Sequence, residues 1–309
     1  MKKIILFMAV SVLLCGAATA AIAERLPPIL STEGLAVSQT LPGLLILDIR
    51  KVEEYKAGHI PGAISAFYNN WAPGRGGLQN EMPLDADLID LLSSSGIQPN
   101  SRVVVYGRTE TMADRVNVTR VAWTLKYAGV KEVSVLSGGF EKWSVLEKRA
   151  VSTDAMKPPK KAYTGKFNKN LLVKKAEVLA KIGKTTIVDV QEPAFFSGQQ
   201  KLPFVPKPGH IQGAVNLPTV QVFEKHPQGV ESSTWLYKNT DALKNMAAGV
   251  VGNDLSKEII VYCDSGRVAT AWWFILSEVL GYQNVKNYDG SMEEWTKDPA
   301  APIEPQAKK

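Results

Sequence analysis

Cysteine is scarce in this chain, with two residues, Cys15 and Cys263, among 309. Cys15 lies in an N-terminal stretch that we expect to be removed, so the mature chain keeps only Cys263 and cannot form an intramolecular disulfide. Histidine is almost as rare, with three residues, and a zinc-type site needs several such ligands together. We therefore expect neither a metal nor another cofactor.

Blocks of a single charge are also missing. The chain has 36 Lys and Arg against 30 Asp and Glu, a net charge of +6, and no basic run is interleaved with aromatic residues. Such a pattern gives no support for nucleic-acid binding, so we expect no nucleic-acid partner. A mildly basic chain suits a small anionic substrate equally well.

Long apolar runs are confined to the first 23 residues. Residues 1–23 combine two lysines, an apolar middle and a small-residue end, which predicts a signal peptide cleaved after Ala20 or Ala23. The protein would then be periplasmic or secreted, with no stable membrane insertion after cleavage. An uncleaved anchor and lipid attachment at Cys15 are the competing interpretations, and Leu14 is bulkier than lipoprotein processing normally accepts.

Buried-strand patterns alternate with helical patterns along the rest of the chain. Continuous apolar runs at 44–50 and 102–107 predict strands, and the spacing at 83–96 and 115–129 predicts helices. This alternation predicts an α/β fold with a central parallel sheet flanked by helices. Residues 151–170 are rich in proline and lysine and have no apolar period, so we expect a linker between two domains at 24–150 and 171–309.

The pattern of the first half recurs in the second. TTIVDV matches LLILDI, PGHIQGAVNLP matches AGHIPGAISAF, EIIVYC matches RVVVYG, and VKNYDGSMEEW matches VSVLSGGFEKW. We therefore expect two tandem domains from an internal duplication. The aligned pairs are Asp48 with Asp189, His59 with His210, Tyr106 with Tyr262, Gly138 with Gly290, and Trp143 with Trp295.

Cys263 stands where a buried strand gives way to an apolar helix, and its counterpart in the first half is Gly107. The loop after it, CDSGRV, is short, and Gly266 can adopt a backbone conformation that other residues resist. Amides pointing inward at a helix start would stabilise a thiolate, so we expect Cys263 to ionise more readily than a free thiol. A buried structural cysteine is the alternative.

With these motifs the chain resembles the tandem-domain rhodanese family, the thiosulfate and mercaptopyruvate sulfurtransferases. The doubled Gly-His-Ile-x-Gly-Ala turns at 58–63 and 209–214 carry much of this resemblance. It implies a site facing the cleft between the domains, where Cys263 takes sulfur from a small anionic donor, holds it as a persulfide and passes it to a thiol, to a cyanide-type acceptor or to a protein acceptor. The loop that would surround the persulfide comprises Asp264, Ser265, Gly266, Arg267 and Val268.

Two positions depart from the family pattern. The family usually places substrate-binding arginines after the aspartate of the second domain, and this chain has Gln191 and Phe195 there. Thiosulfate is thus expected to be a poor donor. A protein that carries persulfide or binds a chalcogen oxyanion for a partner, without efficient turnover, stays open as an alternative. A cysteine-loop phosphatase or arsenate reductase would need arginine where Ala269 stands.

Other polar residues receive simpler interpretations. Arg267 lies inside the short loop and is expected to contact an anion, whereas Asp264 is expected to point to solvent. His59 and His210 recur in both copies, including the copy without cysteine, which favours a structural role. We expect the two strand-end aspartates to anchor nearby backbone amides, and Trp272 and Trp273 to lie in the core.

Overall fold

The computed structural model describes residues 25–158, 160–227 and 233–305. The predicted signal peptide at 1–23 and Cys15 lie outside the described residues. Within the described part, none of the helices is both long and apolar enough to cross a membrane.

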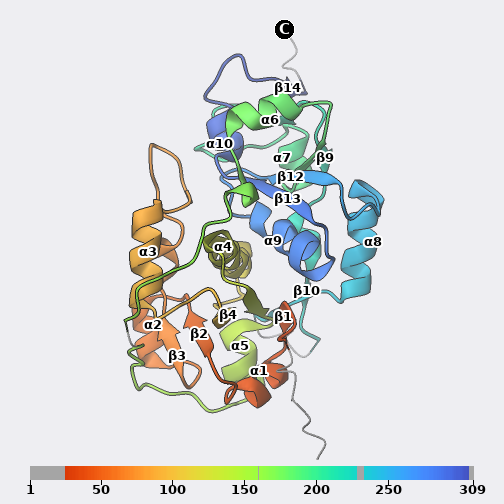
Figure 1. Ribbon diagram of the computed structural model, residues 1–309. Coiled ribbons are helices and arrows are strands. Elements are labelled where there is room, and N and C mark those ends of the chain that lie inside the picture. Colours follow the sequence, from red (N-terminus) through yellow and green to blue (C-terminus); the bar gives the residue numbers. More distant parts are fainter. Residues whose placement is uncertain (1–24, 159, 228–232, 306–309) are drawn as a thin grey trace, which may run out of the picture.

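Two parallel five-stranded sheets organise the fold, one in each half of the chain (Figure 1). Their strand orders, β1-β5-β4-β2-β3 and β6-β13-β12-β7-β9, are the same once the halves are aligned, which confirms the α/β prediction and the internal repeat. The first sheet contains β1 (Ile29–Leu30), β2 (Leu44–Asp48), β3 (Ala63–Ser65), β4 (Arg102–Tyr106) and β5 (Glu132–Leu136). The second contains β6 (Leu172–Val173), β7 (Thr186–Asp189), β9 (Val215–Asn216), β12 (Glu258–Tyr262) and β13 (Asn284–Tyr288).

Helices flank both sheets. The predicted helices at 83–96 and 115–129 correspond to α3 (Asp85–Ser94) and α4 (Met112–Ala128), and α4 ends at Gly129, whose φ of 97° suits a glycine. The others in the first half are α1 (Thr32–Ser38), α2 (Val52–Ala57) and α5 (Gly139–Glu141). The second half has α6 (Lys175–Lys181), α7 (Pro193–Phe196), α8 (Thr240–Val251), α9 (Ala269–Phe274) and α10 (Ser291–Trp295).

Short elements complete the two halves. One-turn 3-10 segments occupy Tyr68–Asn70, Lys169–Leu171 and Thr219–Val222, and π turns occupy Lys142–Leu146 and Ile275–Val279. Two antiparallel pairs join β10 (Phe223–Lys225) to β11 (Trp235–Tyr237), and β8 (His210–Ile211) to β14 (Ile303–Glu304). The sequence patterns predicted none of these pairs, because each strand has only two or three residues.

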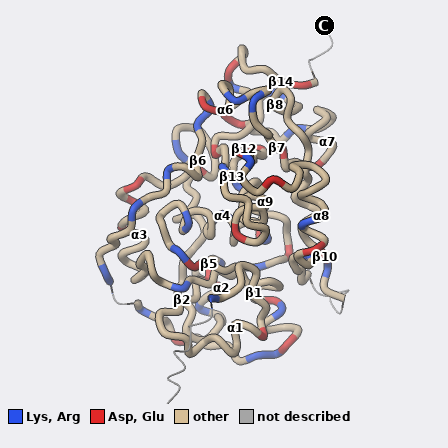
Figure 2. Tube along the Cα trace, turned by 45° about the vertical axis from the view of Figure 1, so that its right-hand side comes forward, with Lys and Arg blue, Asp and Glu red and all other residues tan. Residues whose placement is uncertain are grey.

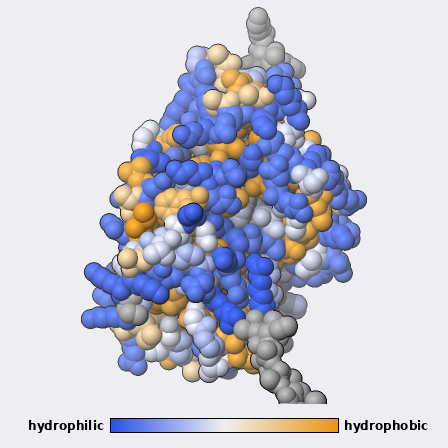
Figure 3. Space-filling model, viewed as in Figure 1, coloured by the Kyte–Doolittle hydropathy of each residue, from blue (hydrophilic) through white to orange (hydrophobic). Residues whose placement is uncertain are grey.

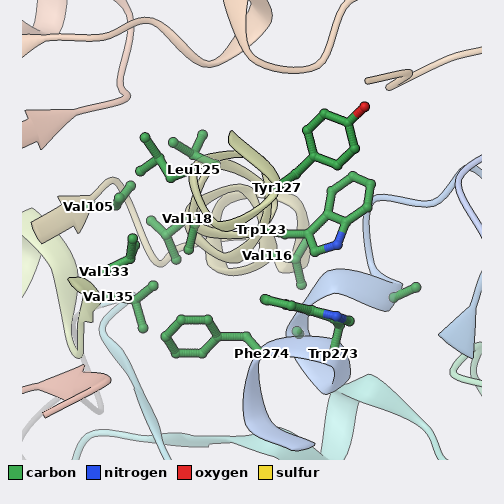
Figure 4. Close-up of a cluster of buried hydrophobic side chains, with 14 of the residues drawn as sticks. Val105, Val116, Val118, Trp123, Leu125, Tyr127, Val133, Val135, Trp273 and Phe274 are labelled. Atoms are coloured by element: carbon green, nitrogen blue, oxygen red, sulfur yellow. The ribbon is translucent and has the colours of Figure 1, made fainter. Parts of the chain in front are cut away.

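We call the parts built on the first and second sheets the first unit and the second unit. Helix α4 of the first unit lies between the two sheets and packs against α9 of the second (Figure 1). Most of α4 is buried, and Figure 4 shows Val116 and Trp123 of this helix close to Trp273 and Phe274 of α9. One hydrophobic core therefore runs through both units. Trp272 and Trp273 are both fully buried, which confirms their predicted place.

The connection between the units is hydrogen-bonded to the first unit along much of its length. Ser152 pairs with His59 as an isolated antiparallel bridge. The Tyr163 hydroxyl donates to the carbonyl of Ala128 at 2.6 Å, and the amide of Asn168 donates to the carbonyl of Tyr127. The connection is thus fixed in place although its sequence has no apolar period. The boundaries 24–150, 151–170 and 171–309 stay a proposal.

Charged residues of both signs are distributed along the whole trace (Figure 2). The face seen in Figure 3 is mostly hydrophilic, with apolar residues interrupted by polar ones. Residues of neither sign dominate the trace in Figure 2, so the chemistry of the protein is better sought at the carboxyl ends of the parallel strands, where open α/β sheets bind ligands.

Candidate active site

Cys263 follows β12 directly, and its side chain is buried, with 1% of the residue exposed. Two amides of its loop are held from α10: the N–H of Cys263 and the N–H of Gly266 donate to Ser291 Oγ at 3.2 and 2.9 Å. Gly266 has a φ of 70°, and a Cβ there would collide with Asp289. The predicted requirement for glycine in this loop is therefore confirmed.

The loop forms an amide cradle around the thiol. Burial, and to a smaller extent the neighbouring Asp264, raise the pKa of the Cys263 thiol to about 11, although the backbone amides of Ala269, Ser265 and Val268 act to lower it. The prediction that this thiol ionises more readily than a free cysteine is therefore wrong in this conformation. The loss of water around the sulfur outweighs the amides.

The prediction that Asp264 points to solvent is wrong. Its Oδ1 accepts a hydrogen bond of 2.6 Å from Gln191 Nε2, and burial raises its pKa to about 6, against the lowering effect of Gln191 and Arg267. Gln191, which stands where the family usually has an arginine, is thus tied to the loop. It does not present a positive charge to a substrate.

Arg267 reaches the boundary between the units. It borders a hollow of about 560 Å³ together with Tyr68, Asn80 and Asn117, all from the first unit. Its Nε is buried and has no hydrogen-bond partner among the described residues. A guanidinium with unused donor capacity beside a hollow is suited to bind an anion.

The first unit contributes a cover to this site, the segment 73–82. Asn80 Nδ2 donates to Ser265 Oγ at 3.0 Å, and the Met82 amide donates to Asp289 Oδ2 at 2.7 Å. The amide of Gln79 donates to Glu293 Oε2 at 3.0 Å. These bonds join the segment to the cysteine loop and to the start of α10.

A buried ion pair joins the units behind the loop. Arg120 of α4 is fully buried and pairs with Asp289, and its Nη1 lies 3.4 Å from the carbonyl oxygen of Gly266. Sequence reasoning missed this pair. The available signal was a single charged residue, an arginine, in the otherwise uncharged and mostly apolar stretch VNVTRVAW, because a charge on a buried helix face needs a partner.

The equivalent place in the first unit has glycine instead of cysteine. Gly107 follows β4, and a Cβ there would lie 3.1 Å from the Ile49 side chain. The adjoining hollow of about 580 Å³ is bordered by Arg108 and Glu54, which form an ion pair of 2.8 Å. The first unit thus keeps the strand-end geometry without the cysteine.

The repeated histidines are held by packing and the repeated aspartates accept backbone amides, as predicted. His59 stacks on Tyr55 with ring centroids 3.8 Å apart, and His210 stacks on Phe196 at 3.7 Å. Asp189 Oδ1 accepts the amide of Gln191 at 2.8 Å. The described residues contain no group of three or more His, Cys, Asp or Glu arranged to hold a metal ion.

The comparisons with known proteins agree with this architecture. The model of the Rhodanese-like domain matches residues 34–146 and 174–298. The chain belongs to the rhodanese family. Both units carry the domain, so the cysteine loop lies in the second of two rhodanese-like domains.

Relatives of the chain match it across both domains. A Mycolicibacterium smegmatis protein provisionally named thiosulfate sulfurtransferase is 35% identical over 263 residues, 81% of this chain and 87% of that protein. The sulfur carrier protein TtuD of Thermus thermophilus is 30% identical over 265 residues, 81% of this chain and 86% of TtuD. The crystal structure of SseA from Escherichia coli, a 3-mercaptopyruvate sulfotransferase by its description, has a TM-score of 0.68 at 26% identity and covers 86% of this chain and 98% of SseA.

Proposed function

We propose that the protein is a sulfurtransferase that works through a persulfide on Cys263. The Cys263 thiolate attacks the sulfane sulfur of a small anionic donor. A new sulfur–sulfur bond forms, the donor bond breaks, and the leaving anion takes its electron pair. A nucleophilic acceptor such as a thiol or cyanide then attacks the outer sulfur, and Cys263 departs as a thiolate.

The observation that carries this proposal is the amide cradle around the Cys263 thiol, formed by Ser265, Val268 and Ala269. Amides aimed at the sulfur are suited to a charge that develops there during transfer. Asp264 and Gly266 complete the loop, and Arg267 places a cation beside it. Because the thiol is buried, we infer that a donor gains access when the segment 73–82 moves away.

Thiosulfate should be a weak donor for this protein. Gln191 is neutral and bonded to Asp264, so Arg267 is the cation of the cysteine loop available to an anionic leaving group. A fixed guanidinium favours both binding and departure of such a group, and a second one is lacking at position 191.

A persulfide carrier that serves a partner, or a chalcogen-oxyanion binder, is the second candidate. It is favoured by the missing arginine at Gln191 and by the similarity to a protein named sulfur carrier. Export is proposed on residues 1–23 alone, with lipid attachment at Cys15 as the lesser alternative.

Turnover separates the two candidates. Steady-state transfer from thiosulfate to cyanide should be measurable, with a high KM, and it should disappear in Cys263→Ser. Arg267→Ala should lower kcat/KM roughly ten- to a hundredfold, the loss of one charge-assisted contact. Single-turnover loading without measurable turnover would favour the carrier, and an unchanged rate for Arg267→Ala would remove that residue from the site.

A further inference from the structure

Tyr68 connects the first unit to the cysteine loop by hydrogen bonds. It lies in the 3-10 turn after β3, with 7% of the residue exposed. Its hydroxyl donates to Asn80 Oδ1 at 2.9 Å, and Asn80 Nδ2 donates to Ser265 Oγ at 3.0 Å. The amide of Ser265 is one of the three that face the thiol. A chain of two hydrogen bonds therefore runs from Tyr68 to the cradle.

The same hydroxyl interacts with the Arg267 side chain. Tyr68 and Arg267 border the same hollow. Burial raises the pKa of Tyr68 to about 12, and the charges of Arg120 and Arg267 act to lower it. The hydroxyl stays neutral at physiological pH, and while it donates its proton to Asn80 its oxygen lone pairs remain available to the guanidinium.

Tyr68 belongs to the unit without a nucleophile. The amides of Tyr68 and Thr219 bond to the carbonyls of Ile49 and Val190 at 3.1 and 3.0 Å, so these two residues occupy equivalent places in the two units. The second unit therefore has threonine where the first has tyrosine. A side chain long enough to reach across the boundary comes only from the first of these two positions.

We propose that Tyr68 is a positioning residue for sulfur transfer, which orients Arg267 directly and Ser265 through Asn80. This inference rests on the proposed function of Cys263 and adds the first unit to its machinery. Tyr68 does not touch the sulfur. It fixes the direction of one cation and one amide, and small errors in such directions are costly in catalysis.

The test is Tyr68→Phe in the full chain, with Tyr163→Phe as the matched control. Tyr163 is also a buried tyrosine whose hydroxyl makes one hydrogen bond, to Ala128 at 2.6 Å, but it has no bond to the loop. Both variants should lose similar stability. Only Tyr68→Phe should lose activity, with kcat/KM for thiosulfate about tenfold lower, as expected for one hydrogen bond to a charged group.

Two further variants distinguish a positioning role of Tyr68 from a general loss of stability. In the Tyr68→Phe background, Arg267→Ala should lower kcat/KM by less than it does in the wild type, because both changes remove the same contribution. Asn80→Gly should also reduce kcat, and its backbone φ of 54° suits glycine. Equal kinetics for Tyr68→Phe and Tyr163→Phe, or fully additive losses with Arg267→Ala, would overturn the inference. A wild type that takes up no sulfur would instead overturn the proposed function beneath it.

Discussion

Asp48 at the end of β2 and Asp189 at the end of β7 test how the partner of a buried carboxyl affects stability. They occupy equivalent buried places in the two units but have different partners. Asp48 accepts from Arg50 Nη2 at 2.6 Å, and the two side chains are 0% and 5% exposed. Asp189 has Gln191 in place of that arginine, and its Oδ2 has no hydrogen-bond partner among the described residues. Burial raises the pKa of Asp189 to about 8. The same residue type thus has a cationic partner in one unit, whereas in the other the Oδ1 accepts a backbone amide and no ion pair is formed with the described residues.

The test replaces each of these aspartates by asparagine in a separate variant. Asp48→Asn leaves Arg50 buried without its counterion, which should cost about 3 to 5 kcal/mol of unfolding free energy. Asp189→Asn replaces a carboxyl that stays mostly protonated up to about pH 8 by a neutral amide, so its cost should be about 1 kcal/mol at acid pH and less than that at neutral pH. Urea denaturation of both variants beside the wild type measures the two free energies directly.

The pH dependence of the unfolding free energy tests the unpaired state of the Asp189 carboxyl independently. The unfolded chain releases the Asp189 proton near pH 4, whereas the folded chain holds it to about pH 8. The wild type therefore loses stability as pH rises through this window, with a slope of up to about 1.4 kcal/mol per pH unit. Asp189→Asn has no carboxyl to titrate at this position and lacks this loss. Its unfolding free energy relative to that of the wild type should therefore increase from acid to alkaline pH. Equal costs for the two variants, or a pH-independent difference between Asp189→Asn and wild type, would refute the reasoning.

The remaining prediction concerns the loop chemistry. Asp264→Asn removes the negative charge that raises the pKa of Cys263, so alkylation of this thiol at neutral pH should become faster, and a rate equal to that of the wild type would show that burial alone sets the pKa. In the wild type the alkylation rate should keep rising with pH towards about 11, and a plateau near neutral pH would mean that the thiol ionises in a more open conformation.

The repeated fold and the place of Cys263 could be predicted because their signals are local. The run at 44–50 becomes β2, and the run ending at Tyr262 becomes β12. Two matching copies of such strands, each followed by the same turn, were enough to predict the sheets. The very short edge strands β1 and β6 were missed, since two residues carry no period.

The contacts between the units could not be predicted in the same way. Arg120 and Asp289 are 169 positions apart, and Asn80 and Ser265 are 185 apart. No local pattern in a single sequence indicates which residues meet over such separations. The cover of the site by the first unit therefore became visible only in the folded chain.

The error over the Cys263 pKa has the same origin. The loop pattern correctly indicated inward amides, which favour the thiolate. It carried no information on the burial of the sulfur, nor on Asp264 turning towards Gln191. Whether a nucleophile's pKa rises or falls depends on burial as well as on its own loop.

The most direct test of the central claim is the intact mass of the full-length protein after incubation with thiosulfate. The account predicts that the wild type gains one sulfur atom, that cyanide removes it, and that Cys263→Ser gains none while keeping nearly the thermal stability of the wild type. A Cys263→Ser variant that gains sulfur as readily as the wild type, or a wild type whose mass stays unchanged with every sulfane donor, would contradict the assignment of Cys263 as the sulfur-carrying nucleophile.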